Sequence, residues 1–583
     1  MVTTELTTRL EGFRNRNSEN PNYINKDIYR MFYKSELYII AYNNIKSNDG
    51  AETEGSDGTS LQGFSQTWID DIIESMRNES YQPNPARTTY IPKQDGSGKM
   101  RKLAFPNGVD KLIQECVRIV LDCIYEPTFS NMSHGYRPNR SIQSATAQVA
   151  TWTGTAWFIE GDIAKCFDEV DHRVLESILR ERIADERFIR LINKLLKAGY
   201  FDTELEFHET KRSVNQGSIC SPILANIYLD KLDRFMESII NRDTKGTSRK
   251  VNPEYGRTRY QRRKAEETGD VTTVKALSKK LKDMPSVDVM DNNFRRVKYV
   301  RYADDFLVGI IGSKAYAKQI KQEIAKFLEE VLKLRLSDTK TKITNVLNSE
   351  TKFLGYRITK GKKHGKIRIL MDTEEIIRRL HRKGFCTKKG YPIGVTKLFN
   401  LPIQDIIKQG NDVLRGLLYN NQGCNNYYQA WRIQYIIQFA IAKTIARKYD
   451  ISMKKVFKQY GKRLTVLYLN PKGQVKERSL ALFQSFARNR EFFKNWNIKL
   501  KEHVKITYDT RNPLKRLCYI CESSQNRKMF HRRKKSLIEK PYSLIVTVMI
   551  KINRRQICLC EECFTQVTNN ELECNQISAA FSG

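Results

Sequence analysis

The 583-residue sequence contains no apolar run long enough to cross a membrane. A spanning helix needs about 18 or more apolar residues, and the best candidate, Ile436 to Ala446, is interrupted by Gln438 and Lys443. The first residues have no apolar core of the kind that signal peptides carry, and Glu5 and Glu11 are unusual in transit peptides. We therefore expect no membrane partner.

Acidic residues are scarce relative to basic ones. Lys and Arg number 101 against 65 Asp and Glu, so the formal net charge is +36 at pH 7, and 40% of the residues are hydrophobic. That hydrophobic fraction is typical of folded domains, and at about 150 residues per domain the length predicts several of them. A positive excess this large favours a polyanionic partner, and we expect nucleic acid.

Cysteines are sparse before residue 518 and crowded after it. Six of the twelve are scattered singly, namely Cys116, Cys123, Cys166, Cys220, Cys386 and Cys424. A secreted disulfide framework would rarely be so uneven, so the usage indicates an intracellular protein. Cys518-x-x-Cys521 and Cys560-x-x-Cys563 supply four thiolates, the tetrahedral set of a structural Zn²⁺ site, with Cys558 and Cys574 as spare thiols.

The chain changes character along its length. Residues 1–27 are polar and are expected to be a loosely held lead-in, followed by a helix from Asp27 to Asn44. A basic stretch, 241–296, interrupts the alternating helices and strands of the middle region and is either a solvated insertion or an arm that contacts RNA. From Asp405 to Lys462 the pattern is helical and strongly basic.

Three carboxylates are predicted to converge in the middle region. Val297 to Ile311 consists of two β-rich runs around Asp304 and Asp305, a pattern typical of a hairpin. An Asp-Asp turn alone is most often just solvated, but a predicted buried strand, Ala156 to Gly161, also ends at a carboxylate, Asp162. A strand end beside such a hairpin tip has the geometry to hold two Mg²⁺ ions. A helical run is expected from Ile163 to Ile183.

These segments resemble the reverse transcriptases of group II introns, the multifunctional intron-encoded proteins. The resemblance rests on EGDIAKCFD around Asp162, then VNQGSICSPILANIYLDKLD, then YVRYADDF around Asp304 and Asp305. Further matching blocks are YIPKQDGSGKMRKLAFP, MSHGYRPNRS, LRLSDTKTKI and FLGYRI. The ordered set is specific and covers most of the chain, so it implies Mg²⁺-dependent copying of RNA into DNA, with the three carboxylates as metal ligands.

The resemblance also implies roles around the metal site. Lys93 and Arg101 flank a Gly-rich turn, and in the family this hairpin grips the incoming triphosphate through charge-assisted contacts, with Arg87 either assisting or a plain surface charge. Phe167 matches the bulky position that clashes with a ribose 2′-hydroxyl and so favours dNTPs. Lys340 matches a lysine proposed to protonate the departing pyrophosphate.

A loop before the long helix of this region is expected to contact the templating base pair. Gln216-Gly217 precedes Ser221-Pro222, which predicts a helix start with Ser221 as N-cap and proline in the first turn. In similar proteins this loop lies under the templating base pair. The family usually has proline before that glutamine, and here Asn215 stands instead.

Two further regions resemble the same family. The basic helical region resembles the maturase (thumb, or X) domain, in which cations and aromatic rings suit folded RNA; its candidate RNA contacts are Arg415, Tyr427, Tyr428, Lys443, Arg447 and Lys448. The cysteine module resembles an HNH endonuclease. His531 fits the general-base position, but Phe530, Phe564 and Thr568 stand where that family has histidines, so we expect zinc binding with weak or absent DNA cleavage.

The expected fold is multidomain α/β. It comprises a right-hand polymerase with fingers and an RRM-like palm carrying an antiparallel sheet, an α-helical thumb/X domain, a small DNA-binding segment and a zinc-stapled HNH-like module. The expected boundaries are 1–155 for the N-terminal extension and fingers, 156–369 for the palm with its insertion 241–296, 370–465 for the thumb, 466–516 for the DNA-binding region and 517–583 for the zinc module.

Three functions remain open at this point. The leading one is a reverse transcriptase and maturase that binds its intron RNA, assists splicing and copies the intron into target DNA from dNTPs. The alternatives are a polymerase of another retroelement without a splicing role, and a splicing factor with a residual polymerase fold. A homodimer is possible. The abundance of Lys, Ile, Asn and Tyr indicates an AT-rich genome, so we expect an organelle interior, with the mitochondrial matrix favoured, or the bacterial cytoplasm.

Overall fold

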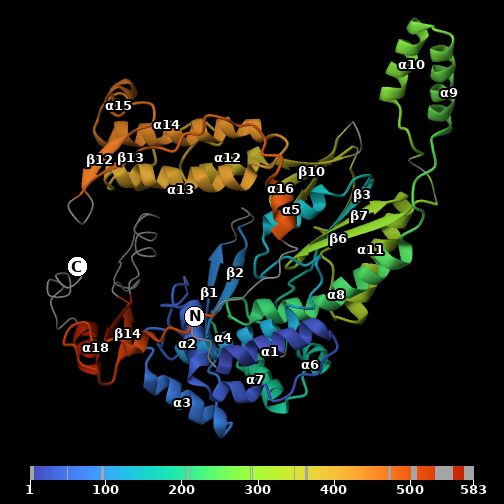
Figure 1. Ribbon diagram of the computed structural model, residues 1–583. Coiled ribbons are helices and arrows are strands. Elements are labelled where there is room, and N and C mark those ends of the chain that lie inside the picture. The colour runs from blue at the N-terminus through green and yellow to red at the C-terminus, as the bar shows by residue number, and fades with distance from the viewer. Residues whose placement is uncertain are drawn as a thin grey trace.

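The computed structural model describes residues 5–569 apart from 49, 93–97, 203, 205, 211, 289–290, 292, 347, 362–365, 470–473, 500–507 and 532–555. Within these ranges the chain is a mixed α/β structure in which many helices surround several small sheets (Figure 1). No described helix combines the length and the apolar character that crossing a bilayer requires.

The N-terminal segment is not a loose lead-in. Helix α1 spans Glu5–Glu19 and buries Leu6, Leu10 and Phe13. Their spacing of four and three residues places them on one helix face, and this face packs in the main hydrophobic core. The expectation of a loose segment was wrong because this narrow apolar stripe is outnumbered by the polar residues around it.

The N-terminal third is a helical layer with one small sheet. Its elements are η1 (Tyr29–Tyr33), α2 (Ser35–Ile45), α3 (Gln66–Arg77), β1 (Ala86–Pro92), β2 (Met100–Phe105) and α4 (Gly108–Tyr125). β1 pairs antiparallel with β2 in a register that places Arg101 opposite Ile91. The sheet order is β2-β1-β4-β5, completed by β4 (Tyr200–Phe201) and β5 (Phe207–His208).

The central sheet separates two hydrophobic cores. It has the order β6-β7-β3-β8, formed by β3 (Trp157–Asp162), β6 (Arg296–Tyr302), β7 (Asp305–Ile311) and β8 (Lys342–Asn345), all antiparallel. Successive side chains of a strand point to opposite faces. Accordingly Tyr299 and Val308 join the first core, with helices α8 (Ser221–Asp243) and α11 (Lys314–Glu330), whereas Val300 and Leu307 join the second, with α5 (Ile142–Ala150).

The expected helix from Ile163 to Ile183 is shorter than predicted. Residues 163–171 form turns and irregular backbone, with Lys165 at φ 47°, and α6 spans only His172–Arg180. The Asp171 side chain accepts hydrogen bonds from the backbone N–H groups of Arg173 and Val174, so it acts as the N-cap that sets this start. Helix α7 (Glu186–Lys197) follows.

The second core continues into a helical layer. Its elements are β9 (Thr351–Phe353), β10 (Tyr356–Lys360), β11 (Ile367–Met371), α12 (Thr373–Arg382), η2 (Thr396–Leu398), α13 (Ile403–Asn421), η3 (Tyr427–Gln429), α14 (Ala430–Lys448) and α15 (Met453–Tyr460). Helix–helix packing of α13 against α14 confirms the helical pattern predicted from Asp405 to Lys462. The next elements are β12 (Val466–Leu469), β13 (Val475–Arg478) and α16 (Phe492–Lys499). Leu480, Phe492 and Phe493 are buried in this same core.

Two parts of the chain stand apart from these layers. Helices α9 (Pro253–Glu267) and α10 (Val271–Asp283) form a hairpin that projects away from the body (Figure 1). The C-terminal elements are η4 (Pro513–Lys515), β14 (Lys528–His531), β15 (Gln556–Leu559) and α18 (Glu561–Thr568). They lie against the N-terminal helices: the Met529 N–H donates to the Phe64 carbonyl at 2.9 Å and the Gly63 N–H donates to the Met529 carbonyl at 2.9 Å.

Candidate functional site

The predicted hairpin is present and presents two carboxylates at its tip. Strands β6 and β7 pair with Tyr302 opposite Asp305, so Ala303 and Asp304 form the two-residue turn. Ala303 has φ 56°, the left-handed backbone that such tight hairpin turns require. The turn thereby places Asp304 and Asp305 at one end of the strands of the central sheet.

Asp162 lies beside this tip because β3 is the neighbour of β7. The two strands pair with Asp162 opposite Asp305, so the three predicted carboxylates meet at one end of the sheet. Burial raises the pKa of Asp304 above its usual value. Asp305 reaches solvent, yet partial burial, followed by the charges of Asp304 and Asp162, raises its pKa to about 7. Carboxylates that oppose one another's ionisation in this way are suited to sharing a cation.

Lys340 contacts the same cluster from the segment before β8. Its Nζ lies 3.1 Å from Asp162 Oδ1 and 3.0 Å from Oδ2. Burial works to lower the pKa of Lys340, but the hydrogen bond to Asp162 outweighs it and raises that pKa. The predicted lysine is therefore within reach of the carboxylate site, as a charged donor.

A buried network supports the hairpin turn from below. Arg301, the last inward-facing residue of β6, forms an ion pair with Asp233 of α8 at 2.5 Å, and both side chains are 0% exposed. Arg301 Nη1 also donates to the carbonyl oxygen of Ala303 at 2.9 Å. The sequence reasoning missed Arg301; the signal was its place in the inward series Val297, Tyr299, Arg301 of an alternating strand.

The segment from the MSHGYRPNRS block packs directly against the turn. A side chain at Gly135 would place its Cβ 2.3 Å from the backbone nitrogen of Ala303, so only glycine allows this approach. The next residue, Tyr136, has φ 57°, and its ring meets that of Phe167 edge-on at 6.2 Å. Phe167 is half-buried, and the charge of Asp304, after burial, contributes to raising the pKa of Tyr136. Phe167 and Tyr136 are therefore neighbours of the carboxylate site.

The Gln216 loop docks onto the N-terminal sheet. The Ala104 N–H of β2 donates to the carbonyl oxygen of Gln216 at 2.7 Å, and Gly217 has φ 112°. The N-cap of helix α8 is Cys220, one residue before the predicted Ser221, which is instead the first helical residue. Ser221 did not take the cap because its Oγ donates to the carbonyl oxygen of Asn215 at 2.9 Å, within this loop.

The predicted triphosphate grip is partly described. Lys93 lies outside the described residues. Arg101 is exposed on β2, and its charge acts to lower the pKa of Asp304. Arg87 is exposed on β1, opposite Phe105. Arg101 is thus the member of this set that the structure connects with the carboxylates.

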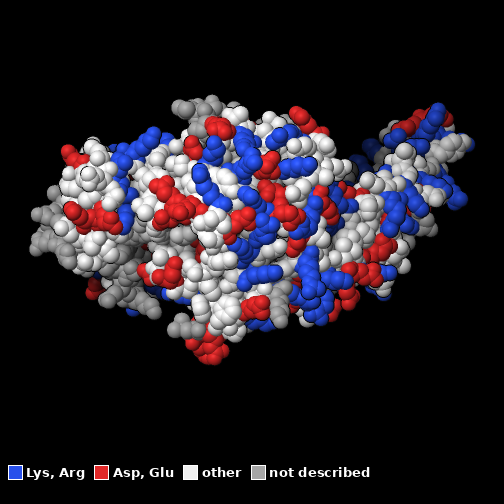
Figure 2. All heavy atoms as spheres, turned by 90° about the horizontal axis from the view of Figure 1, so that it is seen from below, with Lys and Arg blue, Asp and Glu red and all other residues white. Residues whose placement is uncertain are grey.

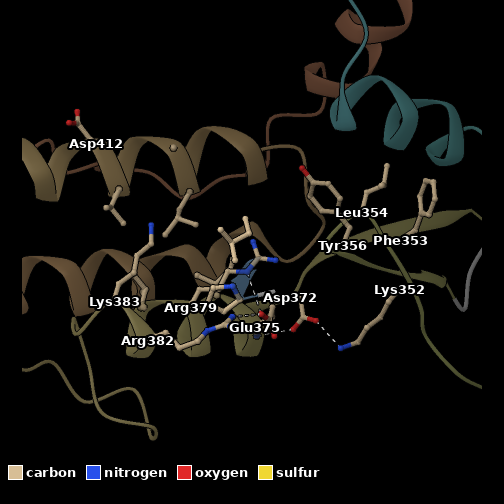
Figure 3. Close-up of a pocket in the computed structure, with 18 of the residues that line it drawn as sticks. Lys352, Phe353, Leu354, Tyr356, Asp372, Glu375, Arg379, Arg382, Lys383 and Asp412 are labelled. Carbon is tan, nitrogen blue, oxygen red and sulfur yellow. Dashed lines mark hydrogen bonds and ion pairs between the residues drawn. The ribbon is translucent and has the colours of Figure 1, made fainter. Parts of the chain in front are cut away.

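A cleft joins this hairpin to the helical layer. It is lined by Gly98 and Arg101 on one side, by the turn from Lys352 to Tyr356, and by α12 and α13 (Figure 3). Glu375 of α12 forms ion pairs with three arginines, Arg378, Arg379 and Arg382, at 3.0, 3.3 and 3.1 Å. This cluster was also missed in the sequence; it leaves net positive charge at the cleft, as a polyanion would require.

The predicted RNA contacts in the helical layer divide by exposure. Tyr428 is 62% exposed, whereas Tyr427 is 5% exposed and packs in the second core. Tyr427 therefore offers no free face for a base, which corrects that expectation. Arg415 of α13 is exposed.

The cations of α14 reach solvent but are partly engaged within the chain. Lys443 Nζ donates to the Pro392 carbonyl at 3.0 Å, and Lys448 Nζ donates to Phe399 and Leu401 carbonyls at 2.7 and 2.9 Å. The Arg447 guanidinium lies 5.3 Å from the Phe399 ring centroid. Arg447 differs from the two lysines in that its partner is a ring and not a carbonyl, so this contact does not occupy its N–H donors.

The four cysteines of the two CxxC pairs come together. The Sγ atoms of Cys518, Cys521, Cys560 and Cys563 lie within 4.8 Å of one another. Burial opposes ionisation of the Cys518 thiol, but backbone hydrogen bonds near Cys521 and Cys560 lower its pKa to about 7. Burial and then the neighbouring thiols raise the pKa of Cys563. Four thiols so arranged fit a tetrahedral cation, whereas Cys558 belongs to the main core instead.

None of the three positions where a nuclease of this kind would have histidines, Phe530, Phe564 and Thr568, offers an imidazole. The backbone of His531 ends β14, paired with Gln556. The ring of Phe530 packs edge-on against that of Phe564 at 5.7 Å, and the Thr568 hydroxyl is satisfied by the Phe564 carbonyl at 2.6 Å. These three side chains fill the module's small core or bond to its backbone.

Comparison with known proteins places two families along the chain. The family described as reverse transcriptase (RNA-dependent DNA polymerase) matches residues 91–251 and 273–358, and the family described as type II intron maturase matches residues 364–503.

Individual relatives cover most of the chain. An uncharacterized 91 kDa protein in a cob intron of Schizosaccharomyces pombe is 34% identical over 98% of this chain and 73% of its own length. The group II intron-encoded protein LtrA of Lactococcus lactis subsp. cremoris is 33% identical over 77% of this chain and 79% of its own length. A putative COX1/OXI3 intron 1 protein of Saccharomyces cerevisiae is 30% identical over 96% of this chain and 70% of its own length.

Proposed function

The chain belongs to the group II intron-encoded proteins, with a reverse transcriptase and an intron maturase region, and from this premise we propose how its residues divide the work. It is an RNA-directed DNA polymerase. Two Mg²⁺ ions would be held by Asp162, Asp304 and Asp305. The intron RNA is the template and the target DNA supplies the primer, so that the intron is copied into that DNA.

The single observation that carries the catalytic proposal is the pairing of Asp162 with Asp305 beside the Asp304 turn. Oxygen ligands at the end of a rigid sheet suit Mg²⁺, which completes its octahedron with substrate phosphates. When bound, such ions stabilise the charge on the attacking and leaving oxygens of phosphoryl transfer. Lys340, already a charged donor to Asp162, would serve as the proton donor to the leaving pyrophosphate.

The remaining polymerase residues bind and select the nucleotide. Arg101, with Lys93 and Arg87, would bind the triphosphate, since guanidinium and ammonium groups make short charge-assisted contacts with phosphate oxygens. Phe167 would exclude the ribose 2′-hydroxyl beside Asp304. Gln216 would support the templating base, held in place by the hydrogen bond from Ala104 to its carbonyl oxygen.

Intron RNA binding would fall to the basic helical layer. Arg415, Tyr428 and Arg447 present free charge or ring surface, and Lys443 and Lys448 add positive charge beside them. The match of residues 364–503 to the maturase family favours this function over a polymerase that has no splicing role. An intact carboxylate cluster argues against a splicing factor with only a residual polymerase fold.

The finer architecture follows the same division. Residues 1–155 would be the N-terminal extension and fingers, 156–369 the palm, 370–465 the thumb, 466–516 a DNA-binding region and 517–583 a zinc module. The four clustered cysteines support Zn²⁺ as a structural ion. The paired rings of Phe530 and Phe564 support loss of the nuclease, so that the priming end in the target DNA would be made by another source, such as a nascent strand at a replication fork. Homodimer formation and an organelle or bacterial interior stay predictions.

Primer extension on an RNA template with dNTPs and Mg²⁺ tests the catalytic assignment. Asp304→Asn should abolish DNA synthesis because it removes one anionic ligand from the metal site. Asp71→Asn, at an exposed position of α3, should leave it unchanged. Wild-type activity in Asp304→Asn would show that the site is misassigned.

Splicing of the parent intron tests the maturase assignment. Adding the protein should improve splicing at low Mg²⁺. The affinity for the intron should fall by about three to five decades between roughly 50 and 200 mM salt if about six to ten phosphates are neutralised. Failure to improve splicing at any protein concentration would remove the maturase function while leaving the polymerase intact.

A further inference from the structure

Part of the α9–α10 hairpin lies outside the sequence pattern of the polymerase family. The reverse transcriptase family matches residues up to 251 and again from 273, so α9 and the turn after it are not part of the shared sequence pattern. At about 1.5 Å per residue, α9 alone extends roughly 22 Å. Figure 1 shows the hairpin leaving the body between α8 and β6, on the side opposite the C-terminal module.

Packing with the body does not explain the hairpin. Helix α10 has no buried residue and α9 has only Thr258 and Ala265, which lie seven residues apart on one face, toward α10. The hairpin therefore contributes little to the folding of the palm.

The two chain segments at the base of the hairpin lie side by side. Val251 pairs with Val287 as an isolated bridge, and the Asp288 N–H donates to the carbonyl oxygen of Lys250 at 2.8 Å. Because Lys250 and Asp288 are already adjacent, the chain can be joined there without the two helices.

Positive charge exceeds what the hairpin neutralises itself. Residues 253–283 contain nine Lys and Arg against five Asp and Glu. Three of the cations are paired: Arg262 with Glu266 at 3.5 Å, Arg263 with Glu267 at 3.2 Å, and Lys280 with Glu254 at 3.2 Å. Six exposed cations form no ion pair with any described residue, namely Arg257, Arg259, Lys264, Lys275, Lys279 and Lys282. Figure 2 shows Lys and Arg along the projecting hairpin.

The free cations are arranged in rows. Lys275, Lys279 and Lys282 follow helical spacing along α10, and Lys280, which reaches α9 through Glu254, marks a different face of that helix. On α9, Arg257, Tyr260 and Lys264 form a second row of the same spacing. Tyr260 is 61% exposed, with the Lys264 ammonium 5.3 Å from its ring centroid, which is a combination that accepts both a phosphate and an unpaired base.

We propose that the α9–α10 hairpin is an RNA-binding arm that grips the backbone of a folded segment of the intron outside the polymerase cleft. The proposal rests on the proposed function in taking the intron as the partner. RNA is favoured over target DNA because the hairpin projects on the far side of the molecule from the C-terminal module (Figure 1). The α10 row, Lys275, Lys279 and Lys282, is a row of point charges with no carboxamide side chain between them, and such a row reads phosphate position and RNA shape, not base sequence.

The test compares two triple variants that remove the same charge. The arm variant is Lys275→Gln, Lys279→Gln and Lys282→Gln in the full chain; the control is Lys314→Gln, Lys318→Gln and Lys326→Gln on α11, whose lysines are exposed on the palm. The probe is the intron RNA transcribed from the sequence around the coding frame, titrated at several salt concentrations. We expect the arm variant alone to bind roughly ten-fold more weakly, with the slope of log affinity against log salt reduced by about two to three.

A deletion supplies the second measurement. Joining Lys250 to Asp288 through two glycines should reproduce the binding loss and remove backbone protection from one segment of the intron, while extension of an oligo(dT) primer on poly(rA) continues at the wild-type rate. Equal binding by arm and control variants, or a loss confined to duplex DNA, would overturn the arm. Failure of the wild-type protein to bind the intron would overturn the proposed maturase function as well.

Discussion

Arg301 and Asp233 form an ion pair from which solvent is fully excluded, with Nε–Oδ1 and Nη2–Oδ2 distances of 2.8 and 2.5 Å. Arg301 precedes the Ala303–Asp304 turn by two residues, and Asp233 lies on α8 behind the sheet. The guanidinium also binds the Ala303 carbonyl, so this pair connects the helix to the turn that holds Asp304.

Replacing Arg301 should separate folding from catalysis. Arg301→Met leaves Asp233 buried without its ion-pair partner, with only the Tyr299 hydroxyl still donating to it at 3.0 Å, and should lower the free energy of unfolding by about 3–5 kcal/mol, measured by chemical denaturation. Arg234→Met, which breaks two ion pairs, with Asp230 and Glu237, of an arginine side chain that is 45% exposed, should cost about 1 kcal/mol or less. Arg301→Met combined with Asp233→Leu should regain stability but not primer extension, because the Ala303 carbonyl still lacks its donor. Full activity in that double variant would contradict the positioning role.

Gly217 should be intolerant of any side chain. Its φ is 112°, and a Cβ at this position would lie only 2.3 Å from the Ala104 carbonyl oxygen, so Gly217→Ala must displace the Gln216 loop from β2. Misplacement by about 1 Å can cost about 100-fold in rate, and we expect that loss in primer extension with little change in thermal stability. Gly12→Ala, in α1 with open space around it, should retain activity. Normal extension by Gly217→Ala would show that the loop does not position the template.

Phe167 should determine sugar selectivity. Phe167→Val removes ring volume beside Tyr136 and should raise the kcat/KM for rNTPs relative to dNTPs by roughly 10- to 200-fold, the range for filling or vacating a few methylene volumes. Phe235→Val, whose ring stacks on Phe327 at 4.1 Å on the far side of the palm helices, should lower stability and leave the ratio unchanged. Steady-state incorporation of both nucleotide classes measures it. An unchanged ratio of rNTP to dNTP kcat/KM in Phe167→Val would show that Phe167 only packs and does not select the sugar.

Zinc should stabilise the N-terminal region as well as its own module. Cys521→Ser should reduce the metal content from about one zinc per chain to none and lower the unfolding temperature of the whole protein, because Met529 of the module is buried in the main core. Cys558→Ala, outside the tetrad, should keep its zinc. Metal analysis and calorimetry distinguish the two variants. Zinc retained in Cys521→Ser would show a different ligand set.

DNA nicking should be weak or absent despite the intact zinc tetrad. A ribonucleoprotein incubated with a labelled duplex target and Mg²⁺ reports each strand separately. With Phe530 and Phe564 packed together, no polar side chain at these positions can stabilise charge on the scissile phosphate. Efficient second-strand nicking that disappears in His531→Ala would show that the module has found substitute ligands.

Local sequence patterns were sufficient where neighbouring residues decide the structure. The alternating runs around Asp304 and Asp305 predicted the β6–β7 hairpin, and the two CxxC spacings predicted the thiol cluster, because strand periodicity and short chelate loops operate over a few residues. The same reasoning failed for α1, where three apolar residues could be recognised as a core stripe only once a surface existed to receive them.

Tertiary structure alone decided the pairs that are distant in sequence. Lys340 reaches Asp162 across 178 positions and Arg301 reaches Asp233 across 68, and neither partner can be named without the packing of α8 and β8 on the sheet. Tyr427 and Tyr428 are neighbours of one residue type, yet one is 5% and the other 62% exposed. Composition cannot separate them, because burial depends on which helices meet there, and that is a property of the whole fold.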